Sequence, residues 1–149
     1  MNLAFFLRPK STITYLYDDS SLQRGLCKLR ESGYSALPVL SREGKYLGDV
    51  SEGDFLWYLA ESHSRQTALR DTKLRDLLSL HPHRTRAMPI TTSMEELLHC
   101  ASRQNFVPVV DDTGSFIGIV SRGDIIRYFA DGLASPPRES VTVVLPAGA

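Results

Sequence analysis

Apolar residues follow two different spacings along this chain, and the spacings alternate in a fixed order. Short runs of β-branched and aromatic residues predict strands, and leucines three or four positions apart predict amphipathic helices. The polar cluster at 18–21 is typical of a helix N-cap, and Gly33 is typical of a helix end. The first half therefore predicts a strand at 13–17, a helix from Leu22 to the Gly33 stop, a hairpin of strands 36–40 and 46–50, and a helix at 55–61.

The second half of the chain repeats this order. It predicts a short linking helix at 73–80, a strand at 84–88, a helix at 94–103, strands at 107–110 and 116–120, and a helix at 123–130. Residues 37–60 align with residues 107–130 at ten identical positions: Pro38/Pro108, Val39/Val109, Gly44/Gly114, Gly48/Gly118, Val50/Val120, Ser51/Ser121, Gly53/Gly123, Asp54/Asp124, Tyr58/Tyr128 and Ala60/Ala130. Such a repeat predicts two similar units, each so short that the two should share a core.

The repeat also predicts the fold class and the domain organisation. The chain is expected to be α/β, of the α+β type, and each unit to run strand, helix, strand, strand, helix. We expect a first unit at 5–62, a polar linker at 63–72, a second unit at 73–132 and a mobile tail at 133–149.

Composition narrows the range of partners. Seventeen basic residues balance seventeen acidic ones, so neither nucleic acid nor an anionic membrane is an expected partner. The apolar opening at 1–7 is too short for a signal peptide or a membrane span and is expected to be a helical turn that packs on the fold. Cys27 and Cys100 are expected to be small buried residues of two helices, which fits a reducing cytoplasm.

The blocks at 37–54 and 107–124 resemble those of a tandem pair of CBS domains, named after cystathionine β-synthase and also called a Bateman module. The resemblance covers about residues 5–132. It implies two βαββα repeats packed about a pseudo-twofold axis and a regulatory role without catalysis. The chain is also similar to small bacterial proteins that consist of CBS domains alone, some of which bind cyclic di-AMP.

The motif Ser-x-x-Asp occurs once in each block and has two interpretations. It is close to a capping box, in which the Ser and the acid satisfy backbone groups at the start of a helix. The same helix start also exposes amide groups and a partial positive charge that attract a phosphate. An ionised Asp can in addition accept both hydroxyls of a ribose, so a nucleotide would satisfy the whole motif.

The resemblance implies a set of ligand-binding residues, with Asp on ribose, Ser on phosphate and adenine held near the strand that carries the Pro. In the second repeat the candidates are Ser121, Arg122, Asp124, Thr85, Asn105, Phe106 and Pro108. In the first repeat they are Ser51, Asp54, Thr12, Tyr34, Ala36 and Pro38. Tyr34 and Phe106 are expected either to stack on a base or to pack in the core.

The two motifs have different neighbours. Asp49 and Glu52 flank Ser51, whereas Ile119 and Arg122 flank Ser121. Only the second motif adds a cation that can bind phosphate with two hydrogen bonds, so the second site is expected to bind more tightly. Alternatively, Arg122 is a solvated residue of the first helical turn. The basic run at 81–86 is expected to be a solvated connector rather than a phosphate contact, and its two His do not predict a metal site.

Function follows from these residues by elimination and by resemblance. No nucleophile with a base, no metal-ligand set and no phosphate loop of the Walker type is evident, so we expect no enzyme. We expect a cytoplasmic sensor that needs no obligatory cofactor, binds an adenine nucleotide as a regulatory ligand and acts on an unidentified downstream protein. The alternatives are a ligand-independent interaction module and a cyclic di-AMP receptor.

The second helices of the two repeats carry Trp57, Tyr58, Leu59, Tyr128 and Phe129. Such faces usually pack in a core, but CBS pairs commonly dimerise through these helices. We therefore expect a homodimer formed through them.

Overall fold

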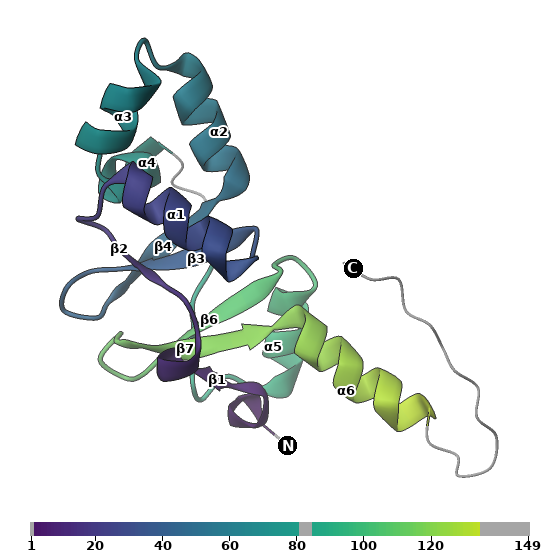
Figure 1. Ribbon diagram of the computed structural model, residues 1–149. Helices are drawn as coiled ribbons and strands as arrows, with labels where there is room; N and C mark the ends of the chain where they lie inside the picture. Colours follow the sequence, from purple (N-terminus) through teal and green to yellow (C-terminus); the bar gives the residue numbers. More distant parts are fainter. Residues whose placement is uncertain (1, 81–84, 135–149) are drawn as a thin grey trace.

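The computed structural model describes residues 2–80 and 85–134, and it places the strands in two sheets with helices around them (Figure 1). The first part of the chain forms η1 (Leu3–Phe6), β1 (Arg8–Pro9), η2 (Lys10–Thr12), β2 (Leu16–Tyr17), α1 (Leu22–Ser32), β3 (Ala36–Leu40), β4 (Tyr46–Ser51) and α2 (Glu52–Glu61). The remainder forms α3 (Arg65–Asp71), α4 (Leu74–Leu80), β5 (Met88–Pro89), α5 (Met94–Ala101), β6 (Phe106–Val110), β7 (Phe116–Ser121) and α6 (Arg122–Ala134).

The two repeats build the same sheet motif, as the sequence predicts. In the first, β2 pairs parallel with β3, and β3 pairs antiparallel with β4. In the second, β5 pairs parallel with β6, and β6 pairs antiparallel with β7. Both hairpins turn through a glycine with positive φ, 85° at Gly44 and 82° at Gly114. The expected α/β class with two related units is confirmed.

Two segments pack in a different repeat from the one that their position in the chain predicts. Strand β1 pairs with β7 of the second repeat, where Arg8 lies opposite Ile119, so the sheet of the second repeat has the order β1-β7-β6-β5. Leu3 and Phe6 of η1 are buried in the core of the second repeat. Helix α4, which follows the expected linker, instead buries Leu74 and Leu77 in the core of the first repeat. The N-terminal segment therefore joins the two repeats.

Each repeat has its own buried cluster. The first cluster consists of Leu16, Leu22, Leu29, Leu37, Val39, Val50, Phe55, Leu74 and Leu77. The second consists of Leu3, Phe6, Leu97, Cys100, Ala101, Val107, Val109, Val120 and Ile125. Most of these positions face inward from strands or from one side of a helix, which is the periodicity that the sequence shows.

The segment at 63–72, expected as a linker, contains α3, which packs on α1 and α2 and buries Ala68. Two local expectations were wrong. The strand expected at 13–17 is shortened to β2. Cys27 is exposed, because Gly25 takes the inward position on α1, where a Cβ would lie 2.9 Å from Leu74. Cys100 is buried as expected, and burial raises the pKa of its thiol. The tail beyond residue 134 lies outside the described residues.

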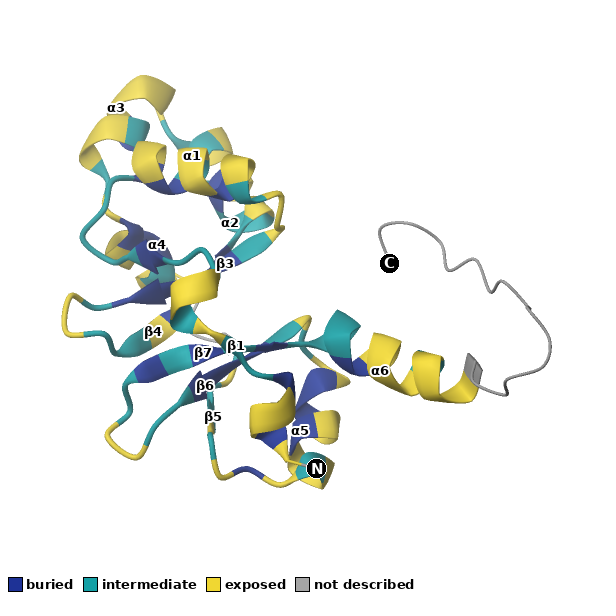
Figure 2. Cartoon of the chain, turned by 60° about the horizontal axis from the view of Figure 1, so that its bottom comes forward, coloured by how far each residue is buried: buried dark blue, intermediate teal, exposed yellow. Residues whose placement is uncertain are grey.

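Helix α6 is longer than expected and projects away from the rest of the described fold (Figures 1 and 2). Its first turns contact the N-terminal segment, since Tyr128 packs edge to face on Phe5 and Phe6 with ring centroids 5.2 and 5.4 Å away. Much of its remaining surface is exposed (Figure 2). Tyr128 and Phe129 are both exposed, so the usual packing of such a face in the core does not apply to them.

Candidate functional site

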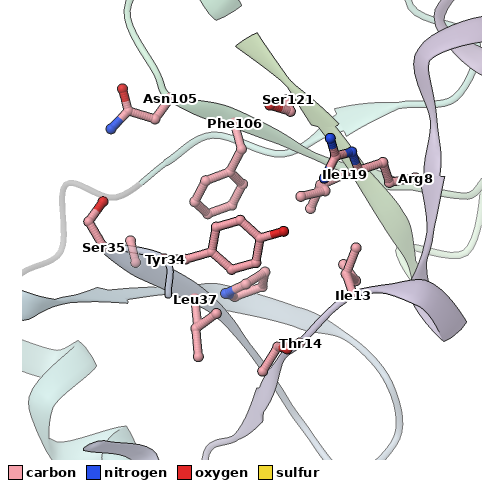
Figure 3. A pocket seen from close by; sticks show the side chains of 12 residues that line it. Arg8, Ile13, Thr14, Tyr34, Ser35, Leu37, Asn105, Phe106, Ile119 and Ser121 are labelled. Atoms are coloured by element: carbon pink, nitrogen blue, oxygen red, sulfur yellow. The ribbon is translucent and has the colours of Figure 1, made fainter. Parts of the chain in front are cut away.

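Two cavities lie where the repeats meet, and each contains the Ser of one Ser-x-x-Asp motif. The Ser121 cavity has a volume of about 120 Å³ and is lined by Arg8, Ile13, Thr14, Tyr34, Ser35, Ala36, Leu37, Pro38, Asn105, Phe106, Ile119 and Ser121 (Figure 3). The Ser51 cavity has a volume of about 590 Å³ and is lined by Ser35, Ala36, Asp49, Ser51, Glu52, Gly53, Thr85, Arg103, Gln104, Asn105 and Phe106.

Each cavity takes its walls from both repeats. Ser121 of the second repeat faces a space lined by Tyr34, Ala36 and Pro38 of the first. Ser51 of the first repeat shares its cavity with Thr85 of the second. Four residues line both cavities and mark the starts of β3 and β6: Ser35, Ala36, Asn105 and Phe106. The structure therefore groups the candidates across the repeats rather than within them.

Five candidates lie outside the residues that line these cavities: Thr12, Pro108, Arg122 and the two acids of the motifs, Asp54 and Asp124. The hydroxyl of Thr12 donates a hydrogen bond of 2.8 Å to the carbonyl of Pro9 and closes the turn of η2. Pro108 sits opposite Ile119 in the register of β6 and β7. Arg122 donates to the side-chain oxygen of Asn105. Arg122, whose guanidinium predicted a tighter second site, is thus held by the side chain of Asn105 at the edge of the cavity.

The first Ser-x-x-Asp motif is a closed capping box at the start of α2. The backbone N–H of Asp54 donates to Ser51 Oγ at 3.3 Å, and the backbone N–H of Ser51 donates to Asp54 Oδ2 at 2.8 Å. Both bonds satisfy donors that a helix start would otherwise leave without partners. The structural interpretation of the motif therefore holds for this copy.

The second motif is arranged differently. Arg8 donates from Nε to Asp124 Oδ2 at 2.5 Å and from Nη2 to Asp124 Oδ1 at 2.7 Å, and Arg127 also donates to Oδ1. This pair joins β1 to the first turn of α6. The hydrogen bonds from Arg8 lower the pKa of Asp124, despite the opposing effect of partial burial, and the same bonds raise the pKa of Arg8.

Two aromatic side chains point into the Ser121 cavity (Figure 3). Tyr34 follows the end of α1 and is 48% exposed, whereas Phe106 begins β6 and is half-buried. Neither belongs to a buried cluster, so ordinary core packing does not explain them. Ile119 and Leu37 extend the apolar wall. A flat, uncharged ring system is the type of group that such a wall can contact.

The cavity residues that were not predicted as ligand-binding candidates include Arg8 and Asp49. Arg8 gives no local signal, because its partner Asp124 lies 116 positions away. Asp49 does have a signal in the sequence, because it is a carboxylate in an apolar strand, at the position that Ile119 holds in the other repeat. His81, His83 and Arg84 of the basic run lie outside the described residues, and Arg86 is exposed.

Other classes of site find no support in the part of the chain that the structure describes. Across residues 2–80 and 85–134, no group of three or more His, Cys, Asp or Glu side chains could hold a metal ion. None of the helices described is long and apolar enough to span a membrane.

Comparisons with known proteins identify the family to which this fold belongs. The model of the CBS domain family matches residues 8–61 and 69–131. An uncharacterised protein of Methanocaldococcus jannaschii, MJ1426, is 29% identical over an aligned length of 142 residues, and the match covers 75% of this chain and 83% of that protein. CbpB, solved in complex with c-di-AMP, superimposes with a TM-score of 0.80 at 21% identity and covers 89% of this chain and 87% of its own.

A second similar structure is the CBS domain of a bacterial CNNM/CorC family Mg²⁺ transporter in complex with ATP. It has a TM-score of 0.69 and 21% identity, and the match covers 87% of each chain. At these identities the solved structures establish a shared fold. Together with the two matches to the family model, they show that this chain belongs to the CBS domain family as a tandem pair.

Proposed function

We propose that this CBS pair is a regulatory module that binds an adenine nucleotide in the Ser121 cavity and transmits its occupancy to another protein. One observation carries the proposal. Tyr34 and Phe106, from different repeats, point into one cavity together with the hydroxyl of Ser121 at the start of α6. The rings would contact the base, and Ser121 with the helix N-terminus would bind phosphate.

The similar structures support the choice of ligand. CbpB binds c-di-AMP and the transporter domain binds ATP, and both compounds contain adenine. The apolar wall of the Ser121 cavity, with Ile119 in place of a charged residue, suits a base that is recognised mainly by shape and backbone groups. Recognition of ribose by Asp124 remains part of the proposal.

Binding would require the N-terminal segment to move. A volume of about 120 Å³ is small beside the roughly 300 Å³ or more of typical ligand pockets. Arg8 and Tyr34 are both partly exposed, at 37% and 48%, so each can shift without opening a core. A ribose on Asp124 would compete with Arg8, and this competition would connect occupancy to β1. A ligand can change the output only by binding two such states with different affinity.

Two alternatives each have an observation in their favour. Both acids of the Ser-x-x-Asp motifs already have protein partners, which favours a ligand-independent interaction module. The similarity to CbpB favours a cyclic di-AMP receptor. The experiment below separates them.

The proposed assembly is a homodimer formed through α2 and α6. Trp57 is 64% exposed rather than packed in the core, and the exposed Leu56 lies beside it on α2. On α6, Ile126, Phe129 and Leu133 are exposed as well. Neighbouring apolar side chains on an exposed helix are a common basis of twofold contacts.

The test is isothermal titration of the purified protein with AMP, ADP, ATP and cyclic di-AMP. We expect one of the three mononucleotides to bind, and Asp124→Ala to weaken that binding by about tenfold or more, because a charged acceptor for the ribose is lost. Asp54→Ala is the matched control, since it changes the same motif in the other repeat. Unchanged affinity in Asp124→Ala would exclude this site, selective binding of cyclic di-AMP would favour the receptor, and no binding of any compound would favour the interaction module.

A further inference from the structure

Asp49 is a buried carboxylate in the wall of the Ser51 cavity. Its residue surface is 8% exposed, and among the described residues only Asp49 and Thr92 are polar and buried. Burial of a carboxylate is costly unless the oxygens find hydrogen-bond donors. A charged side chain at this position therefore requires an explanation.

Donors of the protein use only part of the hydrogen-bond acceptor capacity of the Asp49 carboxylate. In the part of the chain that the structure describes, Asp49 accepts one hydrogen bond, from the backbone N–H of Thr85 to Oδ1 at 3.2 Å. An ionised carboxylate can accept about four. The carbonyl of Thr85 is also held by the hydroxyl of Tyr46 at 2.8 Å, so the segment does not depend on Asp49 alone. The remaining acceptor capacity of Asp49 lies at the cavity wall.

The equivalent position in the other cavity shows that the carboxylate is not needed for the fold. Asp49 lies opposite Pro38 in the register of β3 and β4, and Ile119 lies opposite Pro108 in the register of β6 and β7. Asp49 and Ile119 each line the cavity of their own repeat's motif. Two related sites thus differ in charge at one matched position.

We infer that the Ser51 cavity binds a nucleotide whose base presents adjacent N–H donors, such as guanine, and that Asp49 selects it. Asp49 and Ser51 are two positions apart on β4, so their side chains share a face and lie roughly 7 Å apart along the strand. With phosphate and sugar at the start of α2, as the proposed function places them in the other cavity, a base reaches Asp49. The inference rests on that placement.

The chemistry of the base edges explains the selection. Guanine offers its ring N1–H and its exocyclic amine side by side, and these two donors match the two oxygens of a carboxylate. Adenine offers one amine beside a ring nitrogen that is itself an acceptor and would face negative charge. Hypoxanthine offers the ring N–H alone. Arg103 supplies a guanidinium to the described lining of this cavity, where it can bind a phosphate.

The test compares GMP, IMP and AMP by isothermal titration against the wild type, Asp49→Asn and Asp49→Ile. In the wild type we expect this site to bind GMP more tightly than IMP, and IMP more tightly than AMP. Asp49→Asn keeps an acceptor for the Thr85 N–H but loses the paired charged acceptor, so GMP affinity should fall by about tenfold or more. A purely structural role of Asp49 predicts no such change in Asp49→Asn.

Ile119, the position that matches Asp49, provides the reverse substitution. Ile119→Asp places a carboxylate in the Ser121 cavity and should lower AMP affinity there, whereas Asp49→Ile should leave it unchanged. GMP binding that is absent, or equal in the wild type and Asp49→Asn, overturns the inference while AMP binding still supports the proposed function. If AMP binding is lost in Asp124→Ala but GMP binding persists and is lost in Asp49→Asn, the two cavities bind separate ligands. If no nucleotide binds at all, the proposed function fails as well.

Discussion

Ser51 and Asp54 bind each other, whereas Asp124, in an identical motif, binds Arg8 at the other end of the chain. The first motif is satisfied within one helical turn, and the second joins two elements that are 116 residues apart. The cavities that contain the two motifs also differ. The Ser51 cavity is wide and carries a buried carboxylate, and the Ser121 cavity is narrow, apolar and bordered by Arg8.

The difference arises from β1. This strand pairs with β7, and within residues 2–80 and 85–134 no strand pairs with β4 in the corresponding way, since the sheet of the first repeat has the order β2-β3-β4. Arg8 lies on β1 opposite Ile119 and so reaches the start of α6. In two copies of one motif, the strand at the edge of the sheet thus decides whether the acid caps its own helix or forms a long-range ion pair.

The largest test of this comparison removes the close contact between β1 and β7. A Cβ on Gly118 would lie 2.2 Å from the carbonyl oxygen of Arg8, and its φ of 157° disfavours any side chain. We expect Gly118→Ala to lower the free energy of unfolding by about 3 kcal/mol or more, measured by urea denaturation. The matched variant is Gly48→Ala, since Gly48 has a φ of 152° at the equivalent position of β4, and no strand among the described residues pairs with β4 as β1 does with β7. Equal losses in both variants would contradict the role assigned to β1.

The sequence predicted the parts of this fold that depend on local patterns. The repeat, both hairpins with Gly44 and Gly114, and the end of α1 at Gly33 follow from spacing and from positive φ. The exchange of β1 between the repeats does not, because nothing near Arg8 in the chain indicates Asp124. Gly25 on α1 shows another limit: a glycine has no hydrophobic signal, so the adjoining Cys27 was assigned to the buried face instead.

Several candidate residues line one cavity, but their grouping differs from the predicted one. Ser121, Tyr34, Ala36, Asn105 and Phe106 do lie together, yet they come from different repeats. A sequence repeat indicates which positions are equivalent, but not which face of one repeat meets which face of the other. The ranking of the two sites relied on Arg122, whose side chain binds Asn105.

A smaller expected effect on stability distinguishes the partner of Asp54 from the partner of Asp124. Asp54→Ala and Asp124→Ala should each cost about 1 kcal/mol of stability, the first through a lost cap and the second through a partly exposed ion pair. A double-mutant cycle tells them apart. Arg8→Ala should couple to Asp124→Ala by about 0.5 kcal/mol or more and should add independently to Asp54→Ala. Coupling of Arg8 to Asp54, or none to Asp124, would break the comparison.

The smallest effect is the pH dependence of the Arg8–Asp124 pair. The pKa of Asp124 is lowered in the folded protein, first by its hydrogen bonds to Arg8, from the ordinary value of 3.8. Its contribution to stability is therefore fully present above pH 3.8 and is lost as pH falls through the lower, folded-state pKa. The difference in unfolding free energy between the wild type and Asp124→Asn should stay constant from pH 6 to about pH 4 and shrink below that, in urea titrations at each pH. Because Asn cannot ionise, a difference that stays constant down to pH 3 would mean that Arg8 does not stabilise the charged form of Asp124.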